Sequence, residues 1–105
     1  MPIAKDVVDR LKAKYGEVWT FTRGVYDFVL RCPESAEFRR YTMSVAEDRS
    51  RVWDAQEALA KHAVVFPEDP ELSEILEKRA MLIPAIAGQA ADIAGEAEKL
   101  EAKKA

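Results

Sequence analysis

The sequence predicts a small α+β domain that is mostly helical, with a β-hairpin near its N-terminus. Apolar residues recur every three or four positions over most of the chain, which is the period of amphipathic helices. Residues 17–31 are instead rich in aromatic and β-branched residues with a glycine near the middle, which is typical of two strands joined by a turn. At 105 residues, the chain can form one domain with a small core.

The N-terminal third is expected to contain a helix followed by the hairpin. Residues 3–15 carry apolar side chains near helical spacing, and Gly16 is a typical helix end. Within residues 17–31, Arg23 and Gly24 are the expected turn. A two-stranded hairpin is marginally stable by itself, so its aromatic side chains need to pack on the helices, on a second copy or on a partner. Its outer edges could also pair with another chain.

The central stretch is expected to form the apolar face on which the other elements pack. A helix should begin at Pro33 and run to about Glu47. Residues 48–50 are the expected break before a second helix, which runs to about His62; one continuous helix is the alternative. The apolar, β-branched residues 64–67 are expected to form a buried, extended connector.

The C-terminal third is expected to be helical. Asp69 and Pro70 resemble an N-cap and a first helical position, and the helix should cover residues 70–79. Pro84 either interrupts this region or starts another segment. From Ile83 onward, apolar residues alternate steps of three and four, as in a heptad seam: Ile83, Ile86, Ala90, Ile93, Ala97 and Leu100. We expect residues 1–95 to form the single domain and the charged residues 96–105 to be a helical tail that can fray.

The residues that could carry chemistry are few. The chain has one histidine and one cysteine, so Cys32 and His62 are the only nucleophilic pair apart from those based on serine. We interpret His62 as an imidazole at the edge of the core and Cys32 as a small buried thiol, and expect no catalytic residue. Two such ligands are too few for a zinc site, and no phosphate or dinucleotide motif is present in the sequence. We therefore expect no metal and no cofactor.

The charge pattern argues against nucleic acid and membrane. The net charge is −3, whereas nucleic-acid-binding domains usually carry a basic excess. Four arginines lie among acidic residues in the central helices, which predicts ion pairs on the solvent face, with a phosphate-binding patch as the alternative: Arg39, Arg40, Arg49 and Arg51. No run reaches the roughly 20 apolar residues of a membrane span, and the first residues lack the apolar segment of a signal peptide. These features and the single cysteine predict a cytoplasmic protein.

Aromatic and heptad residues are the candidates for contacts with a partner. Aromatic side chains dominate the energetics of protein interfaces, and five of the nine lie in residues 15–28. Packing in a small core is the alternative interpretation of the same residues. The candidate client or oligomer interface comprises Trp19, Phe21, Tyr26, Phe28, Trp53, Ile83, Ile86, Ile93 and Leu100.

Four short phrases resemble the small tail assembly chaperones of long-tailed bacteriophages and related prophage elements. They occur in the family's order within residues 14–70, as KYG at 14–16, RCP at 31–33, EFRR at 37–40 and VVFP at 64–67. Family members commonly follow the next short helix with a Pro-Gly-Leu turn. This sequence instead has Arg79-Ala80-Met81-Leu82, so the resemblance covers about two thirds of the chain.

The resemblance implies a function without catalysis. Such chaperones bind the long, helical, apolar tape measure protein in the bacterial host cell and keep it soluble before the tail tube polymerises around it. Self-association through the hairpin edge or the heptad seam would multiply weak contacts along such a client, so a homo-oligomer is expected. The alternatives are a small protein-interaction adaptor or regulator, and a minor structural subunit of a phage-like particle.

Overall fold

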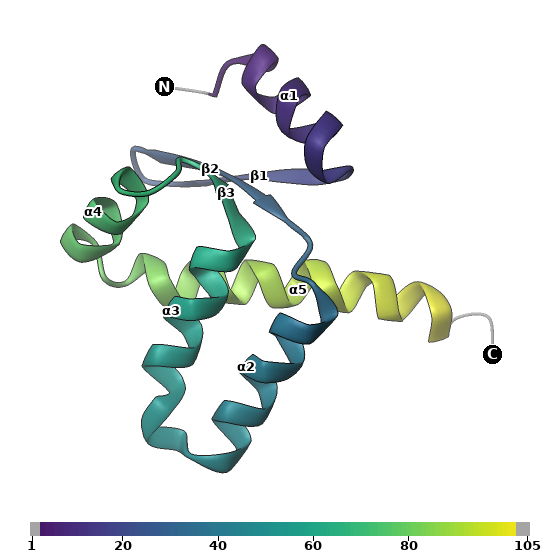
Figure 1. The fold of residues 1–105 in the computed structure, drawn as a ribbon, viewed down its shortest axis with the longest axis vertical. Coiled ribbons are helices and arrows are strands. Elements are labelled where there is room, and N and C mark those ends of the chain that lie inside the picture. Colours follow the sequence, from purple (N-terminus) through teal and green to yellow (C-terminus); the bar gives the residue numbers. More distant parts are fainter. Residues whose placement is uncertain (1–2, 103–105) are drawn as a thin grey trace.

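The computed structural model describes the fold of residues 3–102 and the side chains of residues 3–95. The fold is the predicted α+β domain, mostly helical with one small antiparallel sheet (Figure 1). Its elements are α1 (Lys5–Tyr15), β1 (Val18–Arg23), β2 (Tyr26–Arg31), α2 (Ser35–Glu47), the 3-10 turn η1 (Arg49–Arg51), α3 (Val52–Ala63), β3 (Val64–Phe66), α4 (Glu71–Lys78) and α5 (Leu82–Ala102).

The hairpin turn lies one residue later than the sequence predicts. Arg23 pairs with Tyr26, so the turn consists of Gly24 and Val25 rather than Arg23 and Gly24. Gly24 has a φ of 62°, which suits the first central position of a two-residue turn and is unfavourable for residues with a Cβ. Gly16 ends α1 as predicted, with a φ of 82° and its N–H bonded to the carbonyl of Lys12.

The sheet has a third strand that the sequence interpretation missed. Residues 64–67 were expected to form an extended connector, but Val64–Phe66 form β3, which pairs antiparallel with β2. The strand order is β1-β2-β3, so β2 is central and β1 is an edge. Three β-branched or aromatic residues are too short a run to show strand alternation, and only their position beside β2 makes them a strand.

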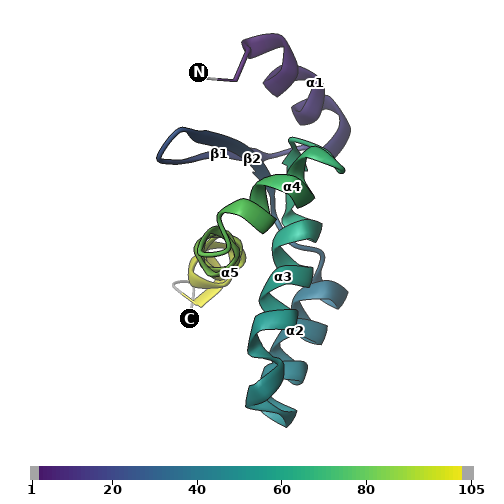
Figure 2. The same cartoon turned by 90° about the vertical axis from the view of Figure 1, so that its left-hand side faces the viewer.

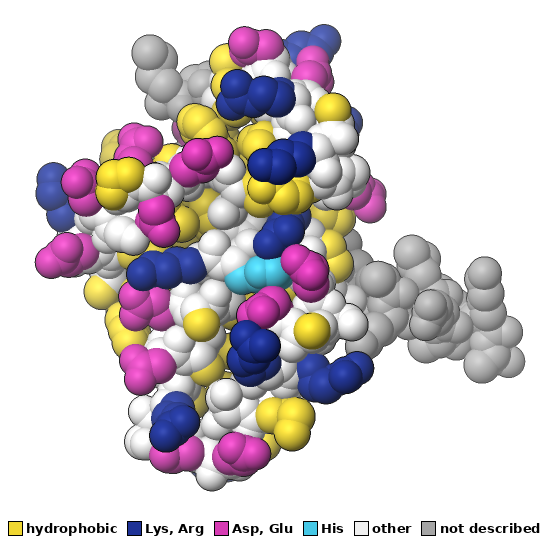
Figure 3. Space-filling view, in the orientation of Figure 1, with side chains coloured by type: hydrophobic (Ala, Val, Ile, Leu, Met, Phe, Trp, Pro, Cys, Tyr) yellow, Lys and Arg dark blue, Asp and Glu magenta, His cyan; other side chains and the backbone are white. Residues whose placement is uncertain are grey.

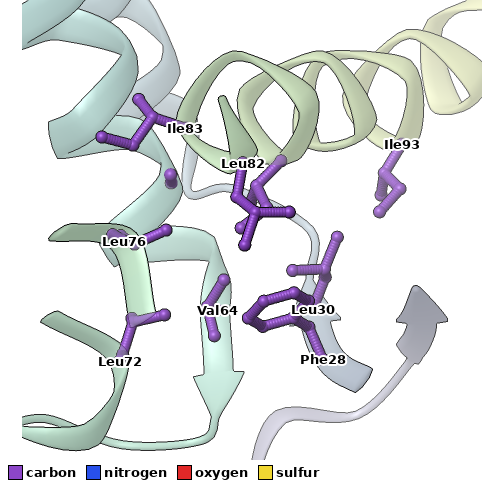
Figure 4. Packing of buried hydrophobic residues seen from close by; sticks show 10 residues of the cluster. Phe28, Leu30, Val64, Leu72, Leu76, Leu82, Ile83 and Ile93 are labelled. Atoms are coloured by element: carbon purple, nitrogen blue, oxygen red, sulfur yellow. The ribbon is translucent and has the colours of Figure 1, made fainter. Parts of the chain in front are cut away.

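The sheet is covered on both faces. Figures 1 and 2 place α1 on one side of the strands and α4 and α5 on the other. Beneath α1, Leu11 packs with Val29 and Val65. On the opposite face, side chains from β2, β3, α4 and α5 converge in the main cluster of the core (Figure 4), with Phe28, Leu30, Val64, Leu72, Leu76, Leu82, Ile83 and Ile93 among its members.

The two central helices form a hairpin, and it is α3 that buries residues against α5. Because α2 has no buried residue and the main cluster lies under the sheet, the central stretch is not the face on which the other elements pack, contrary to the expectation. Asp48 ends α2, and its carboxylate accepts hydrogen bonds from the backbone N–H and the hydroxyl of Ser50 at 2.9 and 2.7 Å. The chain therefore breaks at residues 48–50, and the alternative of one continuous helix is wrong. Leu59 and Ala63 of α3 meet Ala87 and Ala90 of α5, where the small alanine side chains allow close packing.

The C-terminal helices start close to their prolines, although Pro70, and not Asp69, is the N-cap of α4. The Asp69 carboxylate accepts from the backbone N–H of Ser73 at 3.0 Å and from its hydroxyl at 2.6 Å, which satisfies a donor in the first turn of α4. Pro84 lies in the first turn of α5, so it starts a helix rather than interrupting one. The helical backbone of α5 continues to Ala102; residues 103–105 of the predicted tail lie outside the described residues. Among the described helices, none is long and apolar enough to cross a membrane.

Candidate functional site

The described part of the heptad seam of α5, from Ile83 to Ile93, is part of the core. Ile83, Ile86 and Ile93 are 4%, 0% and 7% exposed, and all three belong to the cluster that packs on the sheet. They were predicted as client or oligomer contacts, but the folded chain already buries them. The period-3.5 pattern reports a buried helix face without saying which element covers it. Leu100, the last predicted seam residue, lies outside the described side chains.

The aromatic candidates divide between core and surface. Phe28 is completely buried, and its ring stacks on Phe21 with centroids 6.4 Å apart, so Phe28 is a core residue rather than an interface residue. Trp19, Phe21 and Tyr26 are only partly buried against the same cluster. Trp53 of α3 is 43% exposed and lies apart from the hairpin, beside α4. The structure therefore brings the three hairpin aromatics together but does not join Trp53 to them.

A groove at one end of the molecule exposes two apolar side chains that the sequence interpretation did not select. Val25, in the hairpin turn, is 82% exposed, and Met81, between α4 and α5, is 76% exposed. Both line an open groove of about 720 Å³ between the hairpin turn and the α4–α5 connection. Figure 1 shows these two segments at the same end of the molecule. The other lining residues are Arg23, Gly24, Tyr26, Lys78, Arg79, Ala80 and Leu82.

The charges around this groove are of one sign. Among the described residues that line it, Arg23, Lys78 and Arg79 are basic and none is acidic, although the whole chain is acidic. Exposed apolar side chains flanked by basic residues suit an apolar ligand surface that carries negative charges. We call this surface the turn groove. In the sequence, the signal for the turn groove was Met81, a large apolar residue between two predicted helices and close to the basic residues Lys78 and Arg79.

His62 lies near the end of α3 and contacts Arg31 at the end of β2 and Glu34 at the start of α2. Arg31 donates through Nε to the backbone carbonyl of His62 at 3.1 Å, and its Nη2 lies 3.0 Å from His62 Nδ1. The backbone N–H of Glu34 donates to His62 Nε2 at 3.1 Å. The Arg31 guanidinium also forms an ion pair with Glu34 at 3.5 Å and lies over the ring of Tyr15. These contacts lock β2, α2 and α3 together, which is a structural role.

The surroundings of His62 favour its neutral form. A neutral imidazole has one acceptor nitrogen, so the ring can accept from only one of its two donors, Arg31 and Glu34 N–H. Burial lowers the pKa of His62, and the positive charge of Arg31 lowers it further, against smaller opposing effects of Glu37 and Glu34.

The cysteine lies at the surface. Cys32 is exposed, which corrects the expectation of a buried thiol.

Two of the four arginines predicted to form ion pairs in the central stretch do so among the described residues. Arg40 pairs with Glu37 at 3.1 Å and Arg51 with Asp48 at 3.8 Å. Figure 3 shows acidic and basic side chains interspersed over the face of α2 and α3, with the single histidine between them. This mixture favours the ion-pair interpretation over a phosphate-binding patch.

Metal binding was not expected from the sequence. Among the described residues, no group of three or more histidine, cysteine or acidic side chains is placed to hold a metal ion. Among the described residues, the turn groove is the surface with exposed apolar side chains that is best suited to bind another protein.

No protein-family model matches the chain. No curated protein matches it either. Among solved structures, it is similar to an uncharacterised protein from Bacillus stearothermophilus, with a TM-score of 0.73 and 26% sequence identity. The match covers 84% of this chain and 91% of that chain, so the two proteins share this α+β fold over most of their length.

Proposed function

We propose that this protein is a non-enzymatic tail assembly chaperone of a long-tailed bacteriophage or prophage element. In this role it binds the helical tape measure protein in the cytoplasm of the host cell and keeps it soluble until the tail tube polymerises. The resemblance of residues 14–70 to such chaperones supplies the identity of the client. The observation that supports a protein-binding function is the turn groove, which Val25 and Met81 line with their side chains exposed.

Exposed apolar side chains at one groove are unusual enough to need an explanation. The folded chain buries its heptad seam and Phe28, so its core does not lack apolar residues. Val25 and Met81 nevertheless remain 82% and 76% exposed, on segments far apart in sequence. Methionine is flexible and adapts to varied apolar partners, which suits a surface that must bind many similar segments of one long client.

The shape and charge of the groove fit one face of an amphipathic helix. A helix presents apolar residues at intervals of three and four, and such a face binds in apolar grooves. The basic rim formed by Arg23, Lys78 and Arg79 favours acidic residues beside that apolar face. We therefore expect the recognised client segments to be helical, apolar on one face and acidic at its borders.

Co-expression with the tape measure protein encoded beside it tests this function. A client that is insoluble alone and copurifies with several copies of this chain, seen as the native mass of the complex, would support the proposal. A soluble client that forms no complex would contradict it. One partner bound in a fixed ratio would instead identify an adaptor, and retention of the protein in finished particles would identify a structural subunit.

Two aspartate substitutions test whether the groove is the binding surface. Val25→Asp together with Met81→Asp should weaken client binding by about tenfold or more, because a buried apolar side chain contributes roughly 1.5–3 kcal/mol. Met43→Asp is the matched control, because Met43 is 54% exposed on α2, outside the residues that line the groove. Equal effects of the control and the double variant on binding, measured by titration with a client fragment, would place the site elsewhere.

A further inference from the structure

The edge strand β1 has no partner on its outer side within the described chain. The sheet order is β1-β2-β3, and β3 covers the far side of β2. Natural edge strands usually carry a proline, an inward-pointing charge or a bulge that prevents pairing with another chain. β1 contains no proline, its single charge is Arg23 at its end, and it pairs with β2 in a regular register. This edge is therefore able to accept another strand.

The hairpin geometry fixes which residues offer their backbone groups outward. In a two-residue hairpin, the residues that flank the turn form a hydrogen-bonded pair, and such pairs then alternate along the ladder. Here the flanking pair is Arg23 with Tyr26. Consequently Arg23, Phe21 and Trp19 direct their N–H and C=O groups toward β2, whereas the alternating residues Thr22, Thr20 and Val18 direct theirs away from the sheet.

We propose that β1 pairs antiparallel with β1 of a second copy, about a two-fold axis at Thr20. In this register the two Thr20 residues face each other and Val18 faces Thr22, so all outward backbone groups find partners. Trp19 faces Phe21 of the other copy in a pair without ladder bonds, where side chains lie closest. The result is one six-stranded sheet shared by two chains.

Charge complementarity within the strand selects a second copy as the occupant. Glu17, directly before β1, and Arg23, the last residue of β1, are both exposed and lie three residues to either side of Thr20. Antiparallel pairing about Thr20 therefore places each Glu17 opposite an Arg23, twice in the dimer. A register shifted by two residues loses both ion pairs and keeps one aromatic pair instead of two, Phe21 with Phe21 or Trp19 with Trp19. The chain's own edge is thus complementary to itself in one register.

Pairing also explains the partial burial of the hairpin aromatics. Trp19 and Phe21 are packed against the core but stay partly exposed, and the second copy would cover them with each other's rings. Because residues directly opposite each other share a sheet face, the two turn grooves would lie on the same face at opposite ends of the sheet. This pairing involves only copies of this chain, so it can be tested in the absence of any client.

Charge reversal tests the pairing. The native protein should show twice the chain mass by light scattering, with dissociation on dilution. Glu17→Arg or Arg23→Glu should raise the dissociation constant by about tenfold or more, and the double variant should restore it. Asp9→Arg, an exposed reversal on α1, is the control that should change nothing. A monomer at every concentration, or a dimer indifferent to the single reversals, would refute the interface.

A cysteine placed on the axis tests the register even if a reversal harms folding. In a Cys32→Ser background, Thr20→Cys should form a covalent dimer under mild oxidation, because facing Cα atoms of a hydrogen-bonded pair lie about 5.5 Å apart. Thr22→Cys in the same background is the control, because its two copies would lie four residues apart along the strand, about 14 Å. Equal crosslinking of both variants, or none of Thr20→Cys, would overturn the proposed axis.

Discussion

Truncating Ile86 distinguishes a core helix face from an assembly seam. Ile86 is completely buried and belongs to the main cluster of the core. Ile86→Ala removes three carbon atoms from that cluster. At about 0.8 kcal/mol for each buried methylene, the lost transfer free energy is about 2.4 kcal/mol. The remaining cavity adds to this value, so we expect the free energy of unfolding to fall by about 3–4 kcal/mol.

Urea unfolding followed by tryptophan fluorescence measures this loss. Domains of this size have m-values of about 1.5 kcal/mol per molar urea, so the midpoint should fall by about 2 M. Ile86→Val should cost about 1 kcal/mol, because it leaves a smaller cavity. Val25→Ala is the surface control, because Val25 is 82% exposed, and it should change the free energy of unfolding by less than about 0.5 kcal/mol.

Two results would contradict the core assignment. A loss below about 1 kcal/mol for Ile86→Ala would mean that the side chain is not packed as the structure has it. A loss that appears only at protein concentrations where the chain self-associates would mean that Ile86 is buried between copies. The measurement should therefore be repeated at concentrations on both sides of the dimer dissociation.

Three further results are expected. Because the pKa of His62 is lowered in the folded state, the unfolded chain binds more protons as the pH drops below about 6.5. The free energy of unfolding should therefore fall as the pH drops through that value and level off below the folded pKa. In urea titrations at several pH values, His62→Gln should reduce this dependence. Asp69→Ala should lower the thermal midpoint through loss of about 1 kcal/mol, because Ser73 N–H loses its acceptor, whereas the conservative Asp69→Asn should retain most of it. Gly24→Ala should cost about 1 kcal/mol in chemical unfolding, because its φ of 62° disfavours a Cβ; no change would mean that the turn has another conformation.

Local chemistry was sufficient to predict most of the elements. Gly16 ends α1, Asp48 ends α2, and Pro70 precedes α4 by one residue, all through effects that act within a few residues. Helical periodicity likewise located the helices. It did not show how deeply each is buried, because α2 follows the same pattern and has no buried residue. The hairpin turn was misplaced by one residue because Arg23-Gly24 and Gly24-Val25 both contain the glycine that the turn requires.

The candidate site was predicted less well, for a physical reason. A heptad pattern and a set of aromatics indicate burial, but a sequence does not say whether the covering surface belongs to the same chain. In the structure, α5 uses Ile83, Ile86 and Ile93 inside the domain, and Phe28 is buried with them. The turn groove joins residues that are more than fifty positions apart, at Val25 and Met81, and no local pattern connects them.

The sequence by itself determined the α+β class, the helix ends, the hairpin and the ion pairs along the central helices, because each depends on residues close together in the chain. Only the tertiary structure decided that Val64–Phe66 form a strand and that the α5 seam is core. It also decided that the hairpin turn meets the α4–α5 connection, and that β1 is left as an open edge. These outcomes depend on which distant surfaces pack together, and that choice is made by the burial of the whole core rather than by any one segment.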